Sequence, residues 1–179
     1  MNSKNIKTIR VLAIAPCVQG IGFVVFNGPR LPIDWGVKWT RDEKNAQGMA
    51  KVGDLVECYQ PDVVVFEDYE GEGSRRAERV EELLDAIAAL VDSRNIKIAS
   101  YSRGSVRQLF ATSGAVTKFQ IAEAIAEEIP ELAPRLPPER KIWLPERANM
   151  SIFDAAALAF TYFSTIASEE DGPELEQAA

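Results

Sequence analysis

The chain has 179 residues, of which 46% are apolar and 26% are charged, so it is long enough for one domain with a sizeable buried core. It contains no histidine, which excludes His-based catalytic triads, histidine general bases and histidine zinc ligands. The formal net charge of -7 argues at first against a nucleic-acid partner, because phosphate binding depends on Lys and Arg.

The negative charge is concentrated at the C-terminal end. Residues 168–179 include five acidic residues and no Lys or Arg, so the remainder of the chain has a net charge near −2. We predict one domain over residues 1–167 and a disordered, acidic tail over residues 168–179. A nearly neutral body with local basic patches is compatible with binding DNA or RNA.

The sequence indicates a cytoplasmic protein. Residues 1–10 are too polar for a secretory signal, and no apolar run reaches the roughly 18 residues that a membrane span needs. Only Cys17 and Cys58 are present, without the spacing of a metal site, so we expect two thiols rather than a disulfide. No membrane partner is expected.

The first half of the chain alternates apolar segments with turns. Three strands are expected, over residues 9–15, 20–26 and 32–39. A polar segment over 42–60 has its apolar residues on one helical face and predicts a helix. The next segment, Val63–Phe66, is apolar at every position, which is typical of a strand buried on both faces of a sheet.

The second half of the chain is mainly helical. Ser74 can cap a long helix, residues 96–101 predict a fifth strand, and Thr117 with Gln120 forms a capping-box pattern. Further helices are expected over residues 103–112, 117–129 and 150–167. The predicted order β-β-β-α-β-α-β-α-α-α indicates a mixed five-stranded sheet, a β-hairpin meander plus parallel strands, flanked by helices. This is an α/β chain with the element order of the RNase H-like fold.

Two carboxylates are candidates for chemistry. Glu67 directly follows the fourth strand, at a strand end where the ligand sites of α/β sheets cluster. Asp154 lies in a helix that is apolar nearly all round, where an unpaired carboxylate costs several kcal/mol. A structural role for Asp154 stays open, because Ser151 and Asp154 have capping-box spacing, with Asp154 at the third helical position. Asp68 and Glu70 are interpreted as solvent-facing acids at the strand end.

Several basic residues are candidates for a rim that contacts phosphates. They are Arg75, Arg76 and Arg79, at the start of the helix after Glu67, together with Arg103, Arg107 and Lys118. The alternative is a set of solvated charges paired with neighbouring acids. The tryptophans at positions 35, 39 and 143 could stack on bases, but packing in the core or in the hairpin is favoured.

Five segments, taken in order, resemble the RuvC family of Holliday junction resolvases. They read VLAIAPC, GIGFVV, VVVFE, TKFQIA and FDAAALA, and they lie within about residues 9–163. The resemblance implies an RNase H-like fold and a homodimer that acts on four-way DNA junctions, although RNA as the partner stays open. It also implies hydrolysis of phosphodiesters with two divalent ions, Mg²⁺ or Mn²⁺, held by acidic residues.

Position by position, the resemblance implies a role for three residues. Glu67 and Asp154 match acidic metal ligands, and Lys118 matches a lysine that contacts the scissile phosphate. Glu146, upstream of Asp154, is a candidate further ligand and catalytic residue. Folding must then bring Glu67 and Asp154 together around a gap large enough for a cation.

Two positions depart from the family pattern. Ala15 stands where the family has its first catalytic aspartate, and Ser151 stands where another acid would precede Asp154 by one turn. A methyl group offers no oxygen to Mg²⁺, and the nearby Cys17 is a soft ligand poorly matched to that ion. We therefore expect an incomplete two-metal site. Three functions stay open: a junction endonuclease impaired by Ala15, a catalytically inactive nucleic-acid-binding module, and a protein-interaction module.

Overall fold

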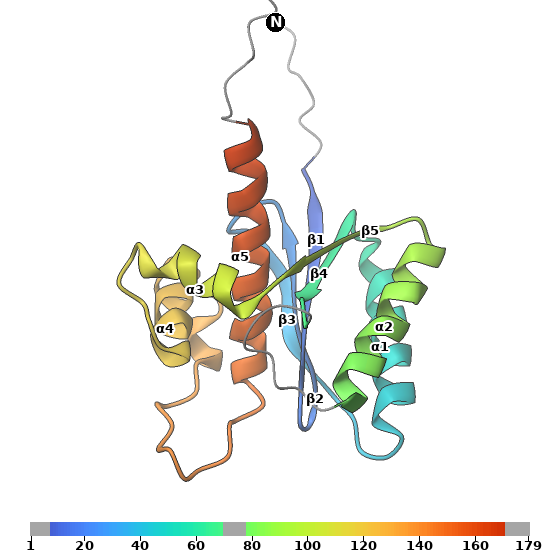
Figure 1. Cartoon of the computed structure of the whole chain (residues 1–179), viewed down its shortest axis with the longest axis horizontal. Helices are drawn as coiled ribbons and strands as arrows, with labels where there is room; N and C mark the ends of the chain where they lie inside the picture. The colour runs from blue at the N-terminus through green and yellow to red at the C-terminus, as the bar shows by residue number, and fades with distance from the viewer. Residues whose placement is uncertain (1–7, 70–77, 171–179) are drawn as a thin grey trace, which may run out of the picture.

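The computed structural model describes residues 8–69 and 78–170. Within these ranges the elements follow the predicted order and form one sheet with helices on both faces (Figure 1). The elements are β1 (Arg10–Cys17), β2 (Gly20–Asn27), β3 (Pro32–Trp39), α1 (Lys44–Tyr59), β4 (Val63–Glu67), α2 (Glu78–Ser93), β5 (Lys97–Tyr101), α3 (Arg103–Ala111), α4 (Lys118–Glu128), the 3₁₀ helix η1 (Ala133–Arg135) and α5 (Met150–Glu170). The expected cap Ser74 and the expected basic residues Arg75 and Arg76, like Glu70, lie outside the described residues.

The sheet is mixed and has the strand order β3-β2-β1-β4-β5. Strands β1, β2 and β3 pair antiparallel as a meander, whereas β4 runs parallel to both β1 and β5. The predicted five-stranded mixed sheet is confirmed. This order places β1 and β4 side by side at the centre, so their carboxyl ends meet at one edge of the sheet.

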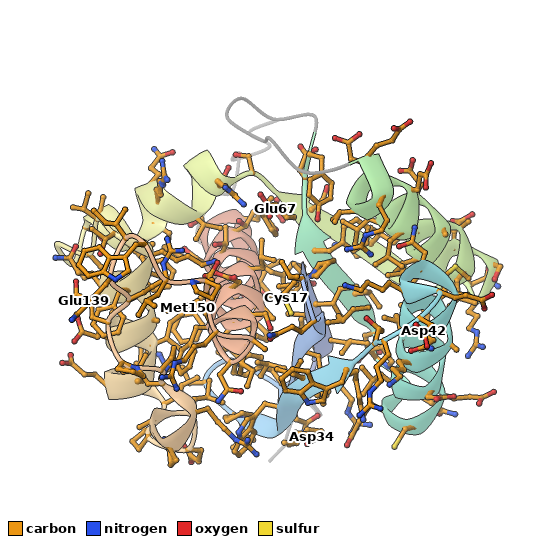
Figure 2. The ribbon with its side chains drawn as sticks, turned by 90° about the horizontal axis from the view of Figure 1, so that it is seen from below. Cys17, Asp34, Asp42, Glu67, Glu139 and Met150 are labelled. Carbon is orange, nitrogen blue, oxygen red and sulfur yellow. The ribbon has the colours of Figure 1, made fainter. Side chains whose placement is uncertain are left out.

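Side-chain alternation along β1 divides the core into two layers. Val11, Ala13 and Ala15 pack on the face covered by α3, α4 and α5, whereas Leu12 and Ile14 pack on the face covered by α1 and α2. Figure 2 shows the strands between these two helical layers. The residue that matters for the site, Ala15, therefore points toward α5.

Helix α5 packs directly on the central strands. Most of its residues from Met150 to Phe163 are buried, and alanines at several of these positions allow a close approach to the sheet. One close approach is at Gly22 of β2, where an added Cβ atom would lie 2.2 Å from Ser151 Oγ. The first turns of α5 are therefore fixed against β2.

The expectation that no segment reaches the length of a membrane span needs a correction at α5. By length and composition, Met150–Glu170 could cross a membrane, but 67% of its most apolar window is buried inside the protein. This burial is typical of the core helix of a globular protein, and the helix extends three residues past the predicted end at residue 167. Both cysteines are free thiols, as expected.

Candidate functional site

One pocket opens at the carboxyl ends of β1 and β4, where α3, α4 and α5 approach the sheet. Its cavity volume is about 250 Å³. Ala15 and apolar residues of α3, α4 and α5 form part of its wall, and six charged side chains share it. These are Glu67, Arg103, Arg107, Lys118, Glu146 and Asp154. The pocket thus brings together Glu67, Lys118, Glu146, Asp154, Arg103 and Arg107, whereas Arg79 of the expected basic rim is not part of it.

The register of the central strands places Ala15 beside Glu67. Backbone pairing aligns Val11 with Val63 and Ala13 with Val65 and ends there, so Ala15 and Glu67 each lie two residues further along on the same face, and both line the pocket. Neighbouring strands lie about 4.8 Å apart, so a carboxylate at position 15 would share this gap with Glu67. The methyl group of Ala15 supplies no ligand there.

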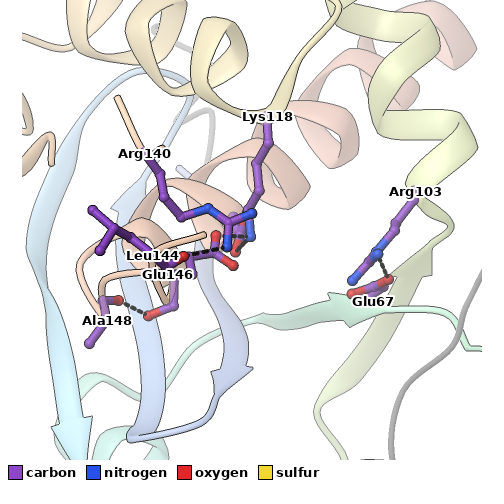
Figure 3. Close-up of polar contacts among 9 residues, drawn as sticks. Glu67, Arg103, Lys118, Arg140, Leu144, Glu146 and Ala148 are labelled. Carbon is purple, nitrogen blue, oxygen red and sulfur yellow. Dashed lines mark hydrogen bonds and ion pairs between the residues drawn. The ribbon is translucent and has the colours of Figure 1, made fainter. Parts of the chain in front are cut away.

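The carboxylate of Glu67 is bound by Arg103. Arg103 Nε donates to Glu67 Oε1 at 2.8 Å, and the Glu67 side chain is only 9% exposed (Figure 3). Ser102 caps α3, because its hydroxyl accepts from the backbone N–H of Ser105 at 3.2 Å, and the cap fixes where Arg103 begins the helix. A buried carboxylate is stable only with such compensation.

Lys118 joins the two other carboxylates of the pocket. Its Nζ lies 2.9 Å from Asp154 Oδ2 and also forms an ion pair with Glu146. Burial alone would lower the pKa of Lys118, but the charge of Asp154 and the hydrogen bond with Glu146 outweigh it and raise the pKa above its ordinary value. The ammonium group therefore stays charged in neutral and mildly alkaline solution.

The position of Lys118 follows from local structure. The predicted capping box is confirmed: Thr117 Oγ1 accepts from the backbone N–H of Gln120 at 3.2 Å, and Gln120 Oε1 accepts from that of Thr117 at 3.0 Å. Lys118 is therefore the first residue of α4 and projects from a fixed helix start.

The structural alternative left open for Asp154, a capping box with Ser151, is wrong. Helix α5 begins at Met150, whose N–H donates to the Arg147 carbonyl at 3.0 Å, so Asp154 is its fifth residue rather than its third. The buried hydroxyl of Ser151 donates to the Ala148 carbonyl at 2.6 Å. Ser151 packs under β2 and is not part of the pocket wall.

The donors present do not fit a two-metal centre. Two ions about 3.5–4 Å apart need several shared oxygen ligands. Here Ala15 offers none, Glu67 accepts from Arg103, and Asp154 and Glu146 are both paired with Lys118. Within residues 8–69 and 78–170 no group of three or more Asp, Glu, His or Cys could hold a metal ion. Instead, each carboxylate of the pocket is paired with a cation of the same chain, Glu67 with Arg103 and both Asp154 and Glu146 with Lys118.

Other sequence-based expectations are wrong or incomplete. Arg79 was expected in the basic rim, but its guanidinium bonds Asn45 Oδ1 of α1 at 3.0 Å, on the opposite face of the sheet. Trp35 packs against the core as expected, whereas Trp39 and Trp143 are 54% and 77% exposed. The ion pair between Arg103 and Glu67 was not predicted from the sequence. The order of elements could have suggested it, because β5 leads into α3 at the same sheet edge where β4 ends.

Solved structures share this architecture. The chain is similar to Thermus thermophilus RuvC, with 19% identity over 89% of this chain and 97% of that chain, and a TM-score of 0.65. T. thermophilus RuvC in complex with Holliday junction substrate gives 18% identity, 89% and 96% coverage and a TM-score of 0.62. The yeast mitochondrial Holliday junction resolvase Ydc2 gives 16% identity, 95% and 84% coverage and a TM-score of 0.63. The chain has a RuvC-type, RNase H-like fold.

Comparison of sequences finds no relative of this chain, in contrast to the comparison of structures. No family model matches the chain, and no curated protein matches it. The RNase H-like fold predicted from the order of elements is nevertheless confirmed, and so is the resemblance to RuvC at the level of fold. The pocket described above therefore lies in a RuvC-type fold, with Ala15 in its wall.

Proposed function

We propose that this protein binds branched DNA, with Lys118, Arg103 and Arg107 contacting phosphates at the mouth of the pocket. The observation that carries the proposal is the convergence of these three cations on one pocket at the sheet edge. Its support is the likeness to RuvC, which has been solved in complex with a Holliday junction. Four-way junction DNA is the substrate class that this likeness favours.

The internal ion pairs leave the cations able to bind phosphate. The side chains of Arg103 and Lys118 are 47% and 46% exposed, so both reach solvent while they hold their carboxylates. A guanidinium has five N–H donors, and the bond from Nε to Glu67 uses one of them. Arg103 can therefore donate to a phosphate oxygen without releasing Glu67.

The form of the bound complex is part of the proposal. A four-way junction presents pairs of equivalent strands, so we propose that two copies of the chain bind one junction, in the cytoplasm. Sedimentation of the protein with and without junction DNA measures the stoichiometry. One copy per junction would contradict the dimer.

The binding proposal is tested by fluorescence anisotropy with a labelled four-way junction and a linear duplex of the same sequence. We expect tighter binding to the junction and an affinity that falls steeply with salt. Lys118→Gln and Arg107→Gln should each weaken binding roughly tenfold, which corresponds to about 1.4 kcal/mol. Arg94→Gln, at the α1–α2 groove on the other face, is the matched control and should bind like the wild type. Failure to bind any nucleic acid at low salt would favour a protein-interaction module.

Metal-dependent hydrolysis of the junction is the second candidate function. The observation that favours it is that Glu67, Asp154 and Glu146 line the same pocket. The test is incubation of labelled junction with the protein in Mg²⁺ or Mn²⁺, with Glu67→Gln as the comparison. Cleavage by the wild type that Glu67→Gln abolishes would support an endonuclease. Intact junction in both samples, together with tight binding, would support a binding module without turnover.

A further inference from the structure

An exposed apolar turn lies beside the pocket. It is formed by Arg140–Leu144, here called the 140–144 turn. Ile142 is 91% exposed, Trp143 is 77% exposed and Leu144 is 49% exposed. Single exposed apolar residues are ordinary, but three large ones in a row at the tip of a turn indicate a contact surface.

The 140–144 turn is held by its own hydrogen bonds. The N–H of Leu144 donates to the Lys141 carbonyl at 2.9 Å. Arg140 Nη1 donates to the Leu144 carbonyl at 3.0 Å (Figure 3). Lys141 Nζ lies 5.6 Å from the centroid of the Trp143 ring, within cation–π distance. An indole and two cations are thus presented together on a fixed turn.

The turn is tied to the pocket through Glu146. Glu146 lies two residues beyond the turn and forms the ion pair with Lys118 inside the pocket. In Figure 3, Arg140 and Leu144 lie on the same side of the close-up as Glu146 and Lys118, opposite Arg103 and Glu67. DNA bound at Lys118 would therefore lie on the same side of the pocket as this turn.

We propose that Trp143 stacks on a nucleobase exposed at the branch point of bound DNA, and that Lys141 and Arg140 contact the neighbouring phosphates. This proposal rests on the proposed binding of branched DNA. Charge favours a nucleic acid as the occupant: the segment 139–147 has three cations, and of its two acids Glu146 is already paired with Lys118. Size favours it too, because three apolar residues are far smaller than a stable protein interface, whereas one indole matches one base.

The test uses a four-way junction with 2-aminopurine next to the branch point and a linear duplex of the same sequence. Trp143→Ala should weaken junction binding roughly tenfold and relieve the quenching of 2-aminopurine, with little change for the duplex. Trp143→Phe should retain most of the affinity, because a phenyl ring still stacks. Trp39→Ala, at an exposed tryptophan of β3, is the matched control and should behave like the wild type.

The other possible outcomes contradict base stacking, recognition of the branch point or DNA binding itself. If the wild type binds the junction and Trp143→Ala binds it equally well, base stacking is wrong while the proposed function stands. An equal loss on junction and duplex would show that Trp143 does not read the branch point. A change in sedimentation of Trp143→Ala without DNA would show a contact between copies instead. If the wild type does not bind the junction, both proposals fall.

Discussion

At position 15 a methyl group forms part of the wall of the pocket that also contains Glu67. Because Ala15, Glu67 and Asp154 line the same pocket, Ala15→Asp should add a third carboxylate to the wall that Glu67 and Asp154 share. We expect Mn²⁺ binding, measured by electron paramagnetic resonance, to tighten roughly tenfold, or about 1.4 kcal/mol. We also expect Mn²⁺-dependent junction cleavage to rise. Ala15→Asn has the same size without the charge, and equal behaviour of the two variants would contradict this role of position 15.

A second residue-scale prediction concerns Tyr59, far from the pocket. The Tyr59 hydroxyl donates to Asp34 Oδ2 at 2.5 Å, and this hydrogen bond, with partial burial and the Asp34 charge, raises the pKa of Tyr59 from 10.0 to about 12. The folded state favours the neutral phenol. Its contribution to stability is therefore complete below pH 10 and is lost as the pH rises from 10 through about 12.

Tyr59→Phe tests this contribution. The variant should lower the free energy of unfolding by about 1 kcal/mol at pH 8, since the pair lies near the surface and solvent screens it. It should also lose less stability than the wild type above pH 10. Urea denaturation across this pH range measures both effects. Tyr101→Phe keeps the Asp34 bond and serves as control, and identical pH profiles for Tyr59→Phe and the wild type would refute the linkage.

Among the elements, α4 owes its start to the capping box at Thr117. Removing the hydroxyl in Thr117→Ala should cost about 1 kcal/mol of stability. It should also weaken junction binding, because Lys118 projects from the first turn of α4. Ser93→Ala, which removes an exposed hydroxyl at the end of α2, should change stability by less than about 0.5 kcal/mol. Denaturation curves that cannot distinguish the two variants would argue against the box.

The packing of α5 on β2 depends on Gly22. A Cβ at this position would lie 2.4 Å from the backbone carbonyl carbon of Ser151, so Gly22→Ala must push α5 away. We expect a loss of about 3 kcal/mol or more, with Asp154 displaced from Lys118. Gly53→Ala in α1 meets only Leu90 Cδ2 at 3.8 Å and should be neutral or stabilising by about 0.5–1 kcal/mol. Similar melting temperatures for both variants would show that α5 is not fixed there.

Features that depend on residues close together in the sequence could be predicted, whereas contacts between residues far apart in the sequence could not. Strand alternation puts Ala15 and Glu67 on one face, and the Thr117 capping box fixes the start of α4, so both could be predicted. The bond from Arg103 to Glu67 joins residues 36 positions apart, and periodicity gives the face of a residue but not its partner. Helix α5 begins at residue 150, as predicted, but the choice between this start and the later one that a Ser151–Asp154 capping box requires depends on the turn before Met150. The exposure of Trp143 depends likewise on a turn without periodicity.

At the scale of the whole molecule, charge opposes the proposed partner. The net charge is -7, whereas the pocket combines three cations with three carboxylates and adds no net charge of its own. Affinity for DNA must then come from short-range contacts, against a long-range repulsion that slows association. This repulsion depends on ionic strength. At 0.01 M salt the Debye length is about 30 Å, so acidic residues far from the binding surface also repel the DNA.

Neutralising the acids near the C-terminus tests this repulsion. Asp171→Asn, Glu174→Gln and Glu176→Gln together change the net charge from -7 to −4. At 0.01 M salt we expect association with junction DNA, followed by stopped-flow fluorescence, to accelerate on the order of threefold. The triple variant Asp54→Asn, Glu57→Gln and Glu82→Gln makes the same change of charge on exposed residues of α1 and α2 and should accelerate association similarly. Near 1 M salt, where the Debye length is about 3 Å, both effects should vanish. An acceleration confined to the C-terminal variant, or one that persists at high salt, would mean that these acids act through a specific contact rather than through net charge.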